Sequence, residues 1–153
     1  MILKVLFFGD IVGRIGRKAI KKITPELKKE YDPDLVFANG ENLAHGVGIT
    51  EKTLNEMIEA GIDFFTSGNH IFRRDGAQEV LSSKETNIIR PANYPPGVPG
   101  EGVKMLEIGS KRVLMVNLLG RVFMGEDRVD CPFRKFDCLS NHILGVIICN
   151  FNR

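Results

Sequence analysis

Three short polar turns carry the residues of this chain whose types and spacing could do metal chemistry. Each turn directly follows an apolar run: G-D-I-V-G spans 9–13, N-G-E-N spans 39–42 and G-N-H spans 68–70. Their donors are Asp10, Glu41, Asn42, Asn69 and His70, a set that suits a hard or borderline divalent ion such as Mn or Fe. Singly, each residue is more typical of a cap, a turn or a surface charge. Their occurrence after three successive strand-like runs favours a metal site.

His70 has two interpretations at this stage. Near a metal-bound phosphate it could protonate a leaving oxygen, and it could equally be a structural loop histidine. His45 follows the N-G-E-N turn and could face the same cleft, whereas His142 lies in a tail without pattern. Five arginines fall near the predicted rim, where they could bind phosphate oxygens or simply face solvent: Arg14, Arg17, Arg73, Arg74 and Arg121.

Apolar runs that alternate with helical patterns must position these turns. This alternation predicts βαβ units with a parallel sheet and right-handed crossovers. In such sheets ligands bind outside the carboxyl ends of the strands, and all three polar turns fall at such ends. The strands are predicted at Ile2–Phe8, Asp34–Ala38 and Ile62–Thr66, and the helices at Arg14–Lys29 and from the N-cap Thr50 to the C-terminal Gly61.

Each helix is expected to bury one apolar face. The first is also expected to be interrupted or re-capped at Thr24-Pro25, because proline removes a backbone donor. Its buried face is predicted to carry Ile15, Ala19, Ile20 and Ile23, and that of the second helix Leu54, Met57 and Ile58.

The remainder of the chain has fewer signals. A weaker helix is predicted at Asp75–Leu81, a short strand at Asn87–Ile89 and a stiff loop at Pro91–Gly100. Two further strands, Val103–Ile108 and Arg112–Leu118, are predicted to form a hairpin. Glycine at the first central position of Gly109-Ser110 suits a type II′ turn.

Composition excludes several classes of protein. The 153 residues fit a single domain, and no apolar run approaches the roughly 18 residues of a membrane span. A net charge of +2 with dispersed basic residues gives no strong nucleic-acid signal. Cys131, Cys138 and Cys149 match no common zinc or redox spacing, so free thiols in a reducing cytoplasm are expected.

Other motif-based functions lack support. The glycines of the first turn give G-x-x-x-G-x-x-G, which is neither the dinucleotide nor the P-loop spacing. A flavodoxin-like nucleotide module would need phosphate-binding loops that the sequence does not offer. A serine hydrolase is disfavoured because no G-x-S-x-G is present and Ile11 follows Gly-Asp where serine is needed.

Several long irregular strings agree with the polar turns in order. They are R-P-A-N-Y-P-P-G at 90–97, N-L-L-G-R-V-F-M at 117–124 and D-C-P-F-R-K at 130–135. Together with the turns, they resemble a bacterial subfamily of calcineurin-like metallophosphoesterases that hydrolyses 2′,3′-cyclic nucleotides. The wider superfamily opens with D-x-H, where this chain has Asp10-Ile11-Val12, so the likeness is to the subfamily. It covers residues 1–135, with a divergent tail at 136–153.

The resemblance implies an α/β sandwich with βαβ units at its N-terminus and a centre of two divalent ions, Fe or Mn. Asp10 is then expected to bind one ion, Glu41 to bridge, and Asn42 and Asn69 to bind the other. His70 is expected to donate a proton to the leaving oxygen. The substrate implied is a small cyclic nucleotide or phosphodiester.

Family members also carry later metal-binding histidines, in F-H-A-E and G-T-H-x-H segments that this sequence lacks. Asn152 stands where the first of them would fall, at the end of a strand-like tail. We therefore expect a single incomplete, truncated domain over 1–153 that holds one ion weakly. Without its other half, the apolar strand Leu114–Leu119 is expected to be exposed, giving low stability, a homo-oligomer or dependence on a complementary C-terminal chain.

Two hypotheses from different classes follow. The chain is either part of a cyclic-nucleotide phosphodiesterase, impaired or inactive alone, or a non-catalytic remnant that binds a metal or phosphate weakly and acts by association.

Overall fold

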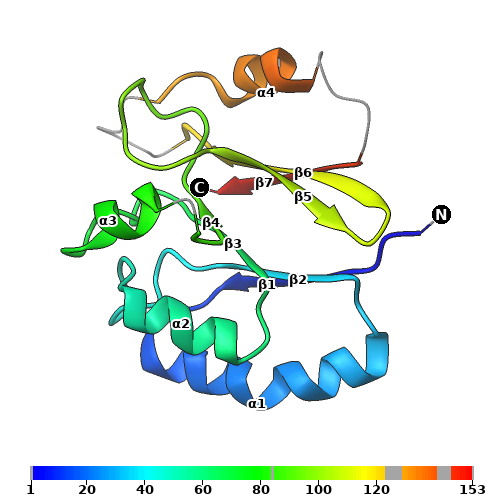
Figure 1. The fold of residues 1–153 in the computed structure, drawn as a ribbon. Helices are drawn as coiled ribbons and strands as arrows, with labels where there is room; N and C mark the ends of the chain where they lie inside the picture. The colour runs from blue at the N-terminus through cyan, green and yellow to red at the C-terminus, as the bar shows by residue number, and fades with distance from the viewer. Residues whose placement is uncertain (1, 84, 123–128, 141–145, 153) are drawn as a thin grey trace.

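Two β-sheets lie face to face between helices in the computed structural model of this chain (Figure 1). Helices α1 and α2 cover the outer face of the first sheet, and α4 covers the outer face of the second. The structure describes residues 2–83, 85–122, 129–140 and 146–152, so His142 lies outside the described residues. The elements are β1 (Val5–Asp10), α1 (Gly13–Tyr31), β2 (Leu35–Asn39), α2 (Glu51–Glu59), β3 (Phe64–Thr66), α3 (Ala77–Ser82), β4 (Ile88–Ile89), β5 (Val103–Ile108), β6 (Lys111–Leu119), α4 (Pro132–Ser140) and β7 (Val146–Asn152).

The first sheet confirms the predicted βαβ organisation. Its strands are all parallel in the order β1-β2-β3-β4. Strand β2 is buried along its whole length, as expected of a strand covered on both faces. Strand β1 extends two residues beyond its predicted end, with a register shift that places Asp10 opposite Asn39. Two of the polar turns are thereby brought side by side.

Helix α1 differs from its prediction in two respects. It runs without interruption through Pro25, because the carbonyl that loses its bond belongs to Lys21 on the exposed side. The predicted apolar face is correct only at Ile20, which packs against the core. Ala19 is exposed, Ile15 is 85% exposed and Ile23 is 42% exposed. The helix instead turns small residues inward, and a Cβ added at Gly16 would lie 3.1 Å from the side chain of Ile11.

Helix α2 begins and ends as predicted. The hydroxyl of Thr50 accepts a hydrogen bond from the Thr53 backbone N–H, and the Thr53 side chain accepts one from the Thr50 N–H. Gly61 ends the helix with a positive φ of 97°, a conformation that glycine adopts without strain. Met57 is fully buried as expected, whereas Ile58 is 41% exposed.

The second sheet has the order β5-β6-β7. Strands β5 and β6 form the predicted antiparallel hairpin, with Ile108 opposite Lys111. Gly109 has a positive φ and Ser110 does not, which fits the predicted type II′ turn. Strand β7 runs parallel to β6, and Asn152 lies opposite Leu119 in this ladder.

The expected exposure of Leu114–Leu119 is wrong. Every residue of this run is at most 5% exposed. One face packs against the first sheet, where Val113 and Met115 contact Phe37 and its neighbours. The other face packs under α4, where Leu114, Val116 and Leu118 form a cluster with Phe136 and Leu139. Helix α4 was not expected from the sequence, and it is the element that covers this face.

Candidate metal centre

The side chains of Asp10, Asn42 and His70 form a hydrogen-bonded line across the three polar turns. The Nδ2 atom of Asn42 donates to both carboxylate oxygens of Asp10, at 2.9 Å each. The Oδ1 atom of Asn42 lies 2.7 Å from Nδ1 of His70. Because the Asp10 carboxylate can only accept, the amide must present its oxygen to His70, so Nδ1 of the imidazole is the donor. This line fixes the orientation of the ring.

Glu41 is a carboxylate that is only 7% exposed. Its Oε2 accepts a hydrogen bond from the His70 backbone N–H at 2.8 Å, and its Oε1 accepts a long one from Asn39 Nδ2 at 3.5 Å. Burial raises the pKa of Glu41 above its usual range, and the hydrogen bond from His70 only partly opposes this effect. Burying a carboxylate is costly unless a cation or hydrogen bonds compensate its charge, so Glu41 is a favourable place for a metal ion.

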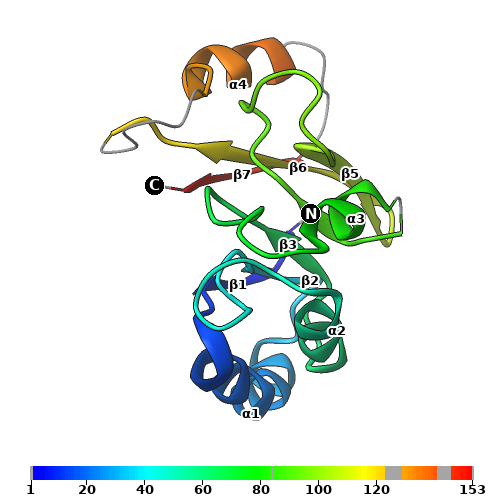
Figure 2. The ribbon, with the colours of Figure 1, turned by 90° about the vertical axis from the view of Figure 1, so that its left-hand side faces the viewer.

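The G-N-H turn lies directly against this carboxylate. A Cβ added at Gly68 would lie 2.7 Å from Cδ of Glu41, so only glycine fits there. Asn69 is half-buried and lies in sequence between Gly68 and His70, which both contact Glu41. Figure 2 views the molecule from the side at which the first-sheet strands end, and the loops after them gather there.

Hydrogen bonds hold the N-G-E-N turn in shape and join it to the end of β3 and to the first polar turn. The Oδ1 atom of Asn39 accepts from the Glu41 backbone N–H at 3.1 Å. The Gly40 N–H donates to Thr66 O, and the Gly13 N–H donates to Asn42 O, each at 2.9 Å. Asn39 was not among the predicted site residues, although asparagine side chains in turns commonly bind the backbone two residues farther on.

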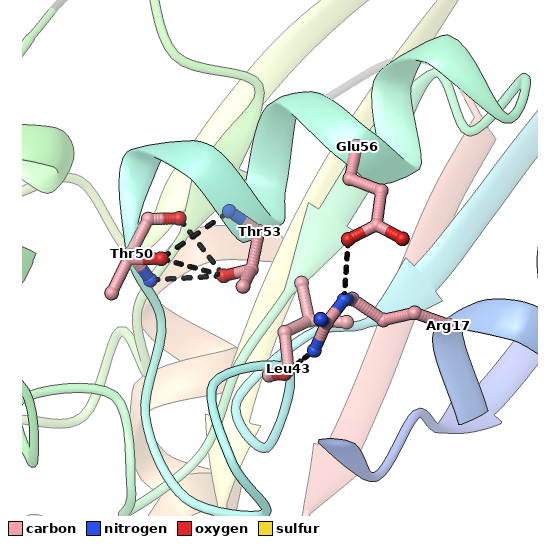
Figure 3. A network of polar contacts seen from close by, with 5 residues as sticks. All are labelled: Arg17, Leu43, Thr50, Thr53 and Glu56. Carbon is pink, nitrogen blue, oxygen red and sulfur yellow. Dashed lines mark hydrogen bonds and ion pairs between the residues drawn. The ribbon is translucent and has the colours of Figure 1, made fainter. Parts of the chain in front are cut away.

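Two of the arginines expected at the rim serve the scaffold instead. Arg17 donates from Nε to Glu56 at 2.7 Å and from Nη1 to the carbonyl of Leu43, which joins α1, α2 and the loop after the N-G-E-N turn (Figure 3). Arg74 donates to Val47 O at 3.0 Å and to Ala44 O at 3.2 Å. The loop that carries Glu41 and Asn42 is thus clamped from both sides, while Arg14, Arg73 and Arg121 are exposed.

Removal of the first clamp is expected to destabilise the protein. Arg17→Ala leaves Glu56 without its partner and the Leu43 carbonyl without its donor, at a cost of about 2 kcal/mol. For a chain of this size the melting temperature should fall by roughly 4–8 °C. Thermal unfolding followed by circular dichroism measures the change, with the exposed neighbour Lys18→Ala as the control. An Arg17 variant that melts with the Lys18 variant would contradict this role.

His45 lies on an exposed part of the same loop, with a left-handed backbone φ of 57°. No described contact joins its side chain to Asp10, Glu41 or His70. The expectation that it faces the site therefore has no support among the described residues.

The donor set fits a hard divalent ion. Within the described ranges no three His, Cys, Asp or Glu side chains converge into a metal cage. Hydrogen bonds instead link the Asp10 carboxylate to Asn42 and Asn42 to His70, whose backbone N–H binds Glu41. Carboxylate and amide oxygens of this kind suit hard ions such as Mn. The buried Glu41 carboxylate is the part of the site that most needs a cation.

Solved structures define the class of protein. The chain superposes on a phosphatase from Mycoplasma pneumoniae with a TM-score of 0.90 and 30% identity, covering 97% of this chain and 54% of that one. A hypothetical protein from Thermus thermophilus gives 0.89 and 37%, covering 97% and 57%. An NAD nucleotidase from Haemophilus influenzae shares the fold at 0.68 and 16% identity, covering 97% and 34%. The fold is the calcineurin-like phosphoesterase sandwich, as the sequence resemblance implied.

The family is narrower than this class. The model of the YmdB-like protein family matches residues 6–152, and the chain belongs to this family. It is 39% identical to a 2′,3′-cyclic-nucleotide 2′-phosphodiesterase of Bacillus subtilis over 135 residues, which cover 88% of this chain and 50% of the relative. The chain thus spans about half the length of the curated relatives that it matches.

The described helices include none that is both long and apolar enough to cross a membrane. Cys131 and Cys138 are free thiols, as expected.

Proposed function

We propose that this chain carries one metal-binding part of a phosphodiesterase that acts on 2′,3′-cyclic nucleotides. The observation that supports it most is the meeting of Asp10, Glu41, Asn42 and His70, from separate turns, at one edge of a parallel sheet. The relatives that share this family include a phosphodiesterase of that specificity.

In the proposed site, Asp10, Glu41, Asn42 and Asn69 would hold divalent metal, Fe or Mn. The metal would supply Lewis-acid chemistry at the phosphate. The scaffold contributes rigidity, because buried hydrogen bonds already orient Glu41 and Asn42 before any ion binds.

His70 is proposed as the general acid. Its Nδ1 atom donates to Asn42, so the ring can deliver a proton only from Nε2. In the cyclic phosphate ring that opens, the leaving oxygen is an alkoxide that needs this proton. The Asp10–Asn42–His70 line keeps the ring in one orientation.

The donor set also supports a second candidate function, in which the chain binds a metal or phosphate without catalysis. Two of the four oxygen donors are neutral amides, and no three-residue metal cage is present in the described part of the chain. Such a set could hold a single ion weakly, so a metal- or phosphate-binding module that acts by association is the alternative. A complementary C-terminal chain is then proposed as the partner that supplies further metal ligands. Free thiols support a cytoplasmic setting.

Hydrolysis of 2′,3′-cyclic AMP with added Mn²⁺ tests the proposal. The purified chain is compared with Glu41→Ala and His70→Ala, and circular dichroism verifies that each sample is folded. We expect turnover that falls at least about 100-fold in both variants, because general acids contribute 10²–10⁴-fold and the metal contributes more. Folded wild-type protein without turnover, but with Mn²⁺ bound, would instead support the binding module.

A further inference from the structure

Asn117 is a polar residue in the middle of an apolar strand. It lies in β6 between Val116 and Leu118, and all three are at most 1% exposed. Its Nδ2 donates to Ser67 O at 2.6 Å and to Ile89 O at 3.3 Å. Burying an amide in an apolar core is costly unless its hydrogen bonds are made. An apolar side chain would fill this position without that cost, so the role of Asn117 is expected to lie in its hydrogen bonds.

The two carbonyls that Asn117 binds belong to the first sheet. Ile89 is the last residue of β4, and Ser67 directly follows the last residue of β3. The hydroxyl of Ser67 also donates to Ile89 O at 2.9 Å, which joins the two strand ends to each other. Asn117 therefore ties the second sheet to the first at the edge where the polar turns lie.

The tie reaches the candidate metal centre through one short segment. Ser67 precedes Gly68, which packs directly against the Glu41 carboxylate. The Gly68 carbonyl also accepts a hydrogen bond from the Tyr94 hydroxyl at 3.4 Å. Two residues farther on, the His70 N–H binds Glu41. A small shift of this segment would either press on Glu41 or break its bond to His70.

We propose that Asn117 is a positioning residue for the metal centre. From the second sheet, it fixes the position of the Gly68–His70 turn relative to Glu41. This inference rests on the proposed function, because it gives the second sheet a part in holding metal ligands. These bonds of Asn117 end on backbone carbonyls, so its effect on the metal ligands would pass through the backbone at Ser67.

The chain offers a matched control in Asn93. It is as fully buried as Asn117 and also donates to two carbonyls, Leu119 O at 2.8 Å and Asp130 O at 2.9 Å. None of these contacts involves the Gly68–His70 turn. The Oδ1 atom of Asn93 also accepts a hydrogen bond from the Leu119 N–H at 2.9 Å. Asn93→Leu therefore removes a fully buried, hydrogen-bonded amide from a different place than Asn117→Leu and controls for the loss of stability.

Two measurements on these variants test the inference. Titration with Mn²⁺ should show affinity lowered at least about tenfold in Asn117→Leu and changed less than about twofold in Asn93→Leu. Hydrogen exchange of the His70 amide in metal-free protein should accelerate in the first variant alone. Equal effects in both variants, or an unchanged Asn117→Leu, would overturn the positioning role.

Two further outcomes have definite meanings. If Asn117→Leu does not fold, Ser67→Ala removes one of the two donors to Ile89 O, and it should accelerate His70 exchange and lower Mn²⁺ affinity about threefold; unchanged values overturn the inference. If the wild type binds no Mn²⁺, the proposed function fails, while His70 exchange in metal-free protein still decides the positioning role.

Discussion

Glu41→Gln will make the metal-free protein more stable at pH 7.5 and will abolish its stabilisation by Mn²⁺. The buried carboxylate has a pKa raised mainly by desolvation, so the folded state holds its proton more tightly than the unfolded chain. Its contribution to stability is therefore greatest at low pH and is lost as the pH rises through the folded pKa. Glutamine has no charge to desolvate, and its oxygen can keep the bond from the His70 N–H.

The expected gain is about 1 kcal/mol, or roughly 2–4 °C in melting temperature for a chain of this length. Thermal unfolding at pH 5 and pH 7.5, with and without Mn²⁺, measures it. The difference between variant and wild type should grow from the lower to the higher pH. Glu79→Gln, on the exposed side of α3, is the control and should change neither value. A Glu41→Gln protein that is less stable at pH 7.5, or that Mn²⁺ still stabilises, would show that Glu41 is not a strained metal ligand.

Gly68→Ala is expected to have the largest effect of any single methyl group in the site. The added Cβ would overlap the Glu41 carboxylate, with Cδ only 2.7 Å away. Glu41 is buried and bonded to His70, so it cannot move aside without losing that bond. We expect a loss of about 2 kcal/mol in stability, within the range for overpacking, and Mn²⁺ binding too weak to measure.

Gly9→Ala is the matched control for this variant. It is the first residue of the G-D-I-V-G turn, and a Cβ there would meet nothing within 4 Å. Its backbone also lacks the positive φ that would strain alanine. Mn²⁺ titration and thermal unfolding of both variants separate the clash from a general effect of replacing glycine. Comparable binding by the two variants would rule out the close contact between Gly68 and Glu41.

The sequence was sufficient for the parts of the site that depend on chain order. Parallel strands end at one edge, so Asp10, Glu41 and His70 could be expected to approach one another once the βαβ pattern was recognised. The cap at Thr50 and the turn at Gly109 depend on neighbouring residues, and both were predicted.

The supporting contacts depend on partners far along the chain and were missed. Asn117 binds a carbonyl 50 residues away, and Arg17 binds one 26 residues away. No local pattern distinguishes such residues from a turn former or a solvated charge. The outward position of Ile15 was missed for the same reason, since close packing at Gly16 decides how α1 rotates.

Titration of the purified chain with Mn²⁺, followed by calorimetry, tests most directly whether the three turns form one metal centre. The account predicts saturable binding that is lost in Asp10→Ala, Glu41→Ala and Asn69→Ala, one variant from each turn, while all three stay folded. Wild-type binding that survives all three substitutions, or folded wild-type protein that binds no ion, would contradict it.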